Sequence, residues 1–152
     1  AGLVIVPLDK ELGFEDIYEQ MEKADAENRP FMNEGIVIKY NGNQKYTSDA
    51  VSSAIFKMIC ERANVPYQTF MNRSDMAGGS TLGNISNTQL SMNTVDIGLA
   101  QLAMHSSYET AGCKDVEYLI RAMTEFYQSE LKSTCDGCYQ LLKTGKEVNR
   151  YE

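Results

Sequence analysis

The strongest constraint on the fold is a strand–helix–strand succession in the middle of the chain. Residues 35–40, GIVIKY, are a short β-branched run between a glycine and an asparagine, as in a buried strand. Residues 47–66, TSDAVSSAIFKMICERANVP, open with capping residues, carry apolar side chains at helical spacing and end at a proline. YQTFMN at 67–72 is a second strand candidate. The succession predicts an α/β fold.

Further segments continue the alternation of strands and helices. The elements we expect are strands at 2–6 and 94–99, a solvated helix at 14–28 and a long amphipathic helix at 115–131. The apolar stripe that should place the last helix against the sheet comprises Val116, Leu119, Ile120, Met123, Phe126 and Tyr127. Together the elements predict a mixed or parallel sheet flanked by helices. We expect one domain over 1–152, in which 132–152 is a tail of uncertain order.

Charge and hydropathy exclude two classes of partner. Twenty-one acidic and fourteen basic residues give a net charge of −7, and no cluster of basic residues interleaves with aromatic ones. An electrostatic nucleic-acid footprint is therefore absent. The apolar runs are far shorter than the roughly 20 residues that span a bilayer, and the first run lacks a basic leader. We expect a cytoplasmic protein without membrane partners.

The four cysteines, at 60, 113, 135 and 138, do not indicate a disulfide scaffold in a chain with this much apolar core. We expect reduced thiols. Cys135 and Cys138 form a C-x-x-C motif, which fits half of a zinc site or a redox pair. No second C-x-x-C or nearby histidine completes four ligands, which favours two incidental thiols near a helix terminus.

Three segments carry residues suited to a binding site. His105, the one histidine of the chain, follows the strand at 94–99, where ligands gather in α/β sheets; it fits a metal ligand or a neutral histidine hydrogen-bonded in a packed loop. Gly79, Ser80 and Thr81 fit a loop that holds a carbonyl or carboxylate, or an ordinary glycine turn. Lys39 ends the strand at 35–40, with Tyr46 shortly after. This cation fits recognition of an acidic group or a lysine reaching to solvent from an edge strand.

Read in order, these segments resemble the C-terminal part of the catalytic domain of the M18 aminopeptidases, the aspartyl aminopeptidase family. The resemblance covers about residues 27–128 and includes NRSDMAGGST followed by DIGLAQLAMHS. Residues 1–24 look unlike the family. The resemblance implies an enzyme that releases single, preferably acidic, residues from peptide N-termini at a two-metal, usually dizinc, centre.

The resemblance also implies roles for individual residues. His105 matches the metal-ligand histidine of the family's Q-L-A-M-H-S motif. Lys39, Tyr46 and the Gly79–Thr81 loop match positions near the substrate pocket, with the loop where substrate is held. Two metals in such a centre activate a water and polarise the scissile carbonyl, while a carboxylate takes the proton.

The chain departs from the family in its metal ligands. A second ligand histidine, the bridging aspartate and the Glu-Glu pair are absent, and LGFEDIYEQMEKADA stands where the family carries Asp-x-x-His-Ala-x-His-Pro-Asn. We therefore assign no catalytic residue and expect an incomplete zinc-aminopeptidase catalytic domain, inactive alone and at most a weak zinc binder. The rival hypothesis is a non-catalytic oligomeric or regulatory α/β module. A third is a different metal site, built from His105 with Cys113 or with acidic residues of a neighbouring subunit.

Overall fold

A computed structural model describes residues 2–4, 24, 27–76, 79 and 82–144. Its elements are β1 (Gly2–Val4), β2 (Ile36–Tyr40), α2 (Ala50–Arg62), β3 (Tyr67–Met71), α3 (Leu82–Gln89), β4 (Ile97–Gly98), β5 (Gln101–Leu102), β6 (Thr110–Gly112), α4 (Cys113–Tyr127), β7 (Ser129–Cys135) and β8 (Cys138–Lys143). The prediction of a mixed α/β fold is confirmed.

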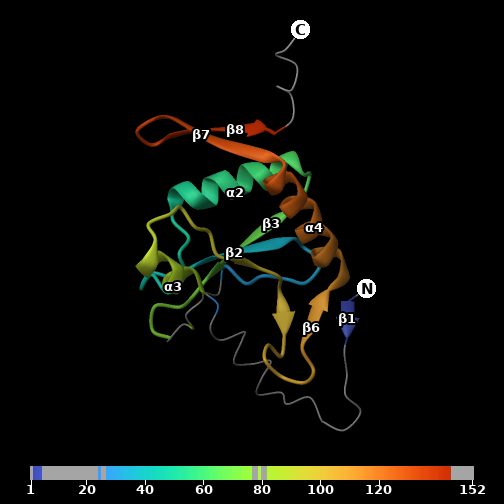
Figure 1. Cartoon of the computed structure of the whole chain (residues 1–152). Coiled ribbons are helices and arrows are strands. Elements are labelled where there is room, and N and C mark those ends of the chain that lie inside the picture. The colour runs from blue at the N-terminus through green and yellow to red at the C-terminus, as the bar shows by residue number, and fades with distance from the viewer. Residues whose placement is uncertain (1, 5–23, 25–26, 77–78, 80–81, 145–152) are drawn as a thin grey trace.

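The central sheet has the order β3-β2-β4, with β2 parallel to β3 and antiparallel to β4. The parallel pair is the predicted strand–helix–strand unit, in which α2 crosses between β2 and β3. In Figure 1, α2 covers one face of this sheet, and α4 lies at the side of the sheet, next to one end of α2. A second sheet of order β1-β6-β5 and the β7–β8 hairpin complete the described part.

The core lies between the sheet, α2, α4 and the hairpin. Its fully buried large side chains include Ile36 and Ile38 on β2 and Ile59 on α2. Ala122 of α4 and Leu141 of β8 belong to the same cluster. Burying an isoleucine side chain contributes roughly 1.5–3 kcal/mol, and β2 supplies two of the fully buried isoleucines, Ile36 and Ile38. β2 is therefore firmly anchored in the core.

Glycine is required where β2 begins. Gly35 has φ +115°, and a Cβ there would lie 2.2 Å from the carbonyl oxygen of Pro66. The same close approach lets the N–H of Ile36 donate to that carbonyl at 3.1 Å. The GIVIKY run therefore enters the sheet at a position that only glycine can occupy without displacing the chain before β3.

The face that α4 buries overlaps the predicted stripe only in part. Its buried residues are Asp115, Ala122 and Glu125, whereas Ile120 and Tyr127 of the predicted stripe are 63% and 76% exposed. α4 ends at Tyr127, four residues before the predicted end, because the chain turns into β7 at Ser129. Leu119 of the predicted stripe does pack against the core, so the stripe marked the packed face only in part.

Other predictions differ in detail. The strand expected at 2–6 is described only at 2–4 and lies in the β1-β6-β5 sheet, apart from β2. Most of the helix expected at 14–28 lies outside the described residues, and Ala24 forms an isolated antiparallel bridge with Asn72. Within 132–152, residues up to Lys143 form the β7–β8 hairpin.

Candidate metal and substrate site

A hollow of about 380 Å³ lies at the carboxyl ends of the parallel strands β2 and β3. It is lined by residues 41–43, which follow β2, and by residues 71–75, which end and follow β3. Ligands of open α/β sheets bind at this edge because the loops after adjacent parallel strands meet there. The hollow therefore marks the edge of the sheet at which a site is expected.

Arg73 and Asp75 form a bidentate pair on the rim of this hollow. Arg73 Nε donates to Asp75 Oδ1 at 3.0 Å and Nη2 donates to Oδ2 at 2.6 Å. Hydrogen bonding to Arg73 holds the pKa of Asp75 below its usual value. The pair links two exposed residues of the loop after β3, which leads to the predicted glycine loop.

Lys39 and Tyr46 meet at the same end of β2. Lys39 Nζ lies 5.1 Å from the centroid of the Tyr46 ring, and it forms an ion pair of 2.9 Å with Asp96 Oδ1. β2 is the central strand of its sheet, so the alternative of a lysine reaching out from an edge strand is wrong. Lys39 is a cation held between a carboxylate and an aromatic ring.

The hydroxyl of Tyr46 is held in its neutral form. Burial raises the pKa of Tyr46, and the nearby carboxylate of Asp96 raises it further. The ring also packs edge-on against Phe70 of β3, with centroids 6.3 Å apart. Tyr46 can therefore donate a hydrogen bond to a ligand at neutral pH while its ring orients Lys39.

Asp96 is the member of this cluster that the sequence interpretation missed. Its backbone carbonyl accepts from Lys39 N at 2.9 Å, and its backbone N–H donates to Ser48 Oγ at 2.8 Å. The carboxylate is consequently buried beside Lys39, with a side chain 8% exposed. The signal in the sequence was a charged residue inside the otherwise apolar run TVDIGL, which is unusual unless the charge is paired.

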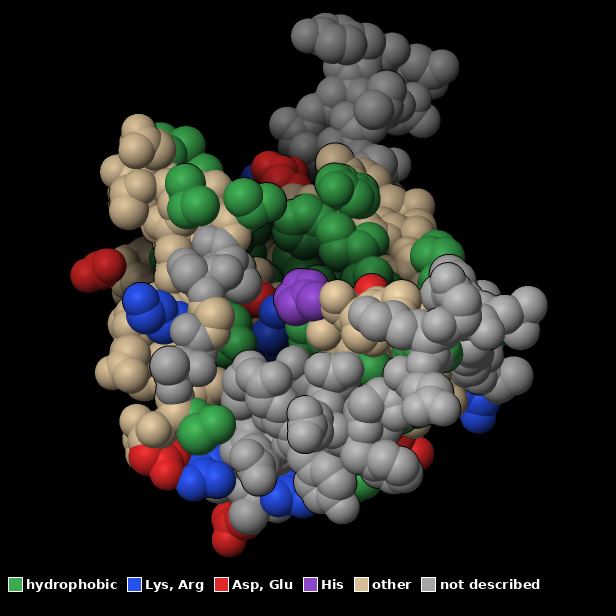
Figure 2. All heavy atoms as spheres, turned by 90° about the horizontal axis from the view of Figure 1, so that it is seen from below, with side chains coloured by type: hydrophobic (Ala, Val, Ile, Leu, Met, Phe, Trp, Pro, Cys, Tyr) green, Lys and Arg blue, Asp and Glu red, His purple; other side chains and the backbone are tan. Residues whose placement is uncertain are grey.

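His105 lies in a turn directly after β5. The turn is closed by a hydrogen bond of 3.0 Å from Ser106 N to Ala103 O, and His105 has φ +69°. Figure 2 shows the imidazole, in purple, at the surface. Among the described residues none hydrogen-bonds the imidazole, while the backbone N–H of His105 contacts Glu109 Oε1 at 3.4 Å. The side chain is thus presented to solvent and is not packed in the loop.

The remaining predicted residues are only partly described. Gly79 is exposed, and a Cβ there would meet no atom within 4 Å. Ser80 and Thr81 lie outside the described residues. Cys113, the third hypothesis's companion to His105, is an exposed thiol at the first residue of α4.

The described residues do not fit a complete zinc centre. Within the part of the chain that the structure describes, no group of three or more His, Cys, Asp or Glu side chains is placed to hold a metal ion. A catalytic zinc normally takes three protein ligands and keeps one open position. His105 has the chemistry and exposure of one such ligand, and we derive no hydrolytic step through a metal on this chain.

Comparison with known proteins gives the class to which this fold and site belong. The family model for the aminopeptidase I zinc metalloproteases (M18) matches residues 15–127, beginning N-terminal to the predicted start at 27. The chain belongs to the M18 aminopeptidase family, as its motifs predicted.

Relatives and solved structures agree with this assignment. The chain is 51% identical over 106 residues to the probable M18 family aminopeptidase 2 of Clostridium novyi, covering 70% of this chain and 24% of that protein. The corresponding protein of Ectopseudomonas mendocina is 46% identical over 108 residues, 71% of this chain and 25% of that protein. The chain thus spans about a quarter of the length of these relatives.

Among solved structures, the cryo-EM structure of the Ape4 and Nbr1 complex matches with a TM-score of 0.67 and 38% identity, over 69% of this chain and 20% of that chain. The crystal structure of yeast aminopeptidase 1 matches with a TM-score of 0.60 and 25% identity, over 78% of this chain and 25% of that chain.

Among the residues that the structure describes, none of the helices has the length and apolar character needed to span a bilayer.

Proposed function

We propose that this chain is the C-terminal portion of a zinc metallo-aminopeptidase that removes N-terminal, preferably acidic, residues from peptides, and that the chain alone does not hydrolyse them. Its site supplies one metal ligand, His105, and substrate contacts from Lys39, Tyr46 and the Gly79–Thr81 loop. The observation that carries the proposal is the Lys39–Tyr46 pair at the carboxyl end of β2. We place the protein in the cytoplasm.

The pair suits an acidic substrate side chain. An ammonium carries three donors, so the ion pair with Asp96 leaves Lys39 able to bond a second carboxylate. A neutral Tyr46 hydroxyl adds another donor. Asp96 already offsets the charge of Lys39, so binding of an acidic side chain would depend on the hydrogen-bond donors of Lys39 and Tyr46 more than on net charge.

A first experiment concerns the isolated chain. Purified protein titrated with Zn²⁺ in a calorimeter should show no tight one-to-one binding, and it should not release nitroaniline from Asp- or Glu-4-nitroanilide. His105→Ala should behave the same way. Robust zinc-dependent turnover by the unaltered chain would show that its catalytic machinery is complete.

A second experiment places the segment in a complete enzyme. Residues 27–127, which leave out the divergent segment before residue 27, would replace the matching part of the Clostridium novyi relative, with the unaltered relative as the activity control. The chimera should hydrolyse Asp-4-nitroanilide and bind zinc, and His105→Ala should lower both. Lys39→Met should raise the KM for the acidic substrate. If His105→Ala changed neither zinc binding nor hydrolysis in a folded chimera, His105 would not be a metal ligand.

The alternative function is a non-catalytic module that assembles with copies of itself. It is favoured by the exposed apolar residues Val116, Ile120, Phe126 and Tyr127 on α4, since exposed apolar patches mark association surfaces. The matched Saccharomyces cerevisiae mApe1 structure is a dodecamer. Light scattering would decide: a defined oligomer that binds no zinc and is unchanged by His105→Ala favours this module.

A further inference from the structure

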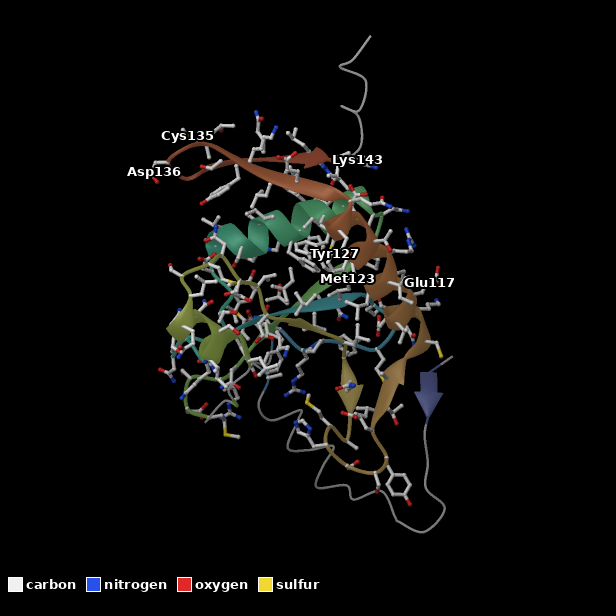
Figure 3. The ribbon with its side chains drawn as sticks, viewed as in Figure 1. Glu117, Met123, Tyr127, Cys135, Asp136 and Lys143 are labelled. Carbon is white, nitrogen blue, oxygen red and sulfur yellow. A yellow bond between two sulfur atoms is a disulfide. The ribbon has the colours of Figure 1, made fainter. Side chains whose placement is uncertain are left out.

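The tip of the β7–β8 hairpin carries two exposed cysteines joined to each other. Cys135 ends β7, Cys138 begins β8, and the two form a disulfide with Cα atoms 4.9 Å apart. Figure 3 shows Cys135 and Asp136 at the end of the hairpin that points away from α4. This corrects the expectation of two reduced, incidental thiols near a helix terminus, because the motif lies in a strand–turn–strand.

The backbone positions the two sulfurs independently of the bond between them. Cys135 and Cys138 are directly paired residues in the antiparallel register of β7 and β8. Asp136 and Gly137 form the turn, and Gly137 has φ +71°, a left-handed conformation that favours glycine. Directly opposed residues have Cβ atoms within the span of a disulfide, so the reduced pair remains poised to close again.

The hairpin is also anchored at its other end. Leu141 is buried in the core, and its carbonyl accepts a hydrogen bond from Arg62 Nη2. Beyond β8, Thr144 N donates to Gln128 O at 2.7 Å. A disulfide across two turn residues closes a very short loop, so its removal releases little chain entropy. Opening the bond should therefore leave the fold intact.

We propose that Cys135 and Cys138 form a reversible thiol–disulfide exchange site whose co-substrates are small thiols and their disulfides. A thiolate RS⁻ attacks one sulfur of the Cys135–Cys138 bond, forming a mixed disulfide and releasing the other cysteine as a thiolate, which takes a proton from water. A second RS⁻ attacks the sulfur of the attached R group. This step forms RSSR and frees the second cysteine, so the two electrons come from the two small thiols.

The other cysteines show why this pair is distinct. Cys60 is buried in the core, and burial raises the pKa of its thiol to about 12. Cys113 is exposed, but the structure pairs it with no other cysteine of the described part. Only the hairpin pair combines exposure with a partner sulfur among the described residues. This site is independent of the proposed peptidase function.

The test uses the full chain carrying Cys113→Ser, equilibrated with reduced and oxidised glutathione at a series of ratios. After trapping with iodoacetamide, trypsin releases residues 133–143, which contain both cysteines, as one peptide. We expect a closed form with no label and an open form with two, interconverting on the same curve from either direction. Circular dichroism should show unchanged helix content across the series. Cys135→Ser should instead give a singly glutathionylated peptide.

Two results would overturn the proposal. One is a pair that stays doubly labelled even in fully oxidised glutathione, because the hairpin would then not bring the sulfurs together. The other is a disulfide that opens only when urea has unfolded the chain, because the site would then not exchange in the folded protein.

Discussion

The carboxylate of Asp115, at the start of α4, accepts the backbone N–H of Gly35, 80 residues earlier in the chain, at 3.0 Å. Its other oxygen accepts from Asn33 N at 2.6 Å. Asp115 is fully buried, and a Cβ at Gly112 would lie 2.5 Å from its Oδ2. One carboxylate thus joins the beginning of β2 to the beginning of α4, and the small residue before the helix makes room for it.

Asp115→Asn should destabilise the protein. The substitution keeps the size of the side chain but presents an NH₂ group to one of two backbone N–H donors, leaving that donor buried without a partner. We expect the free energy of unfolding to fall by about 2 kcal/mol, measured by urea denaturation followed by circular dichroism.

Glu117→Gln is the matched control, because Glu117 lies two residues further along α4 and is exposed (Figure 3). This change should alter the free energy of unfolding by less than about 0.5 kcal/mol. If Asp115→Asn were no more costly than Glu117→Gln, the carboxylate would not be the join between β2 and α4.

Local sequence patterns predicted which helices and strands form better than they predicted how these elements pack. The β-branched run of β2 and the capped, proline-ended α2 have short-range causes, and both formed as predicted. The buried face of α4 includes Asp115, which accepts a hydrogen bond from the backbone N–H of Gly35, 80 residues away, and no periodicity encodes this contact. An apolar stripe indicates which side of a helix avoids water, but Asp115 and Glu125 occupy the side that is packed.

At the candidate site, too, short-range features could be predicted from the sequence and long-range contacts could not. Lys39 lies near the end of β2 and Tyr46 follows that strand closely, so short-range sequence indicated that both lie at this end of β2. Asp96 reaches Lys39 only because β4 pairs with β2, a long-range contact that spacing did not reveal. The β7–β8 hairpin was missed because its residues alternate weakly and its turn, Asp136–Gly137, was read only as the spacer of a C-x-x-C motif.

The cap of α2 should give a pH-dependent contribution to stability. Asp49 accepts from Ser52 N at 2.7 Å, and this hydrogen bond holds its pKa below the usual value. Because the pKa is lower in the folded state, the contribution is complete above the unfolded pKa and is lost as pH falls through the folded one. Asp49→Ala should cost about 1 kcal/mol at pH 7 and less at pH 3.

Asp49→Asn separates the hydrogen bond from the charge, since asparagine also caps helices. It should retain most of the stability at pH 7 but lack the decline on acidification that comes from this group. Urea denaturation at pH 7, 5 and 3 would measure both variants. An Asp49→Ala cost that grows at pH 3 would have the wrong sign for this cap.

Asp96→Asn should lower the pKa of Tyr46. The carboxylate disfavours the tyrosinate, so its removal eases ionisation, and the freed charge of Lys39 above the ring acts in the same direction. NMR titration of tyrosine labelled at the ring carbon that bears the hydroxyl would follow the change, with Tyr46→Phe assigning the signal. Lys39→Met is the opposing variant and should raise the pKa. Equal values in all three proteins would show that the cluster is not coupled.

Cys60 should be almost inert toward iodoacetamide in the folded protein. Its pKa of about 12 leaves roughly one thiol in ten thousand ionised at pH 8, against roughly a quarter for an ordinary cysteine, and only the thiolate reacts. We expect Cys113, which is exposed, to be labelled first, with Cys60 labelled only in urea or as the pH approaches 12. Mass spectrometry of the tryptic peptides distinguishes the two sites. Rapid labelling of Cys60 at pH 8 in folded protein would mean that its thiol is not buried in the core.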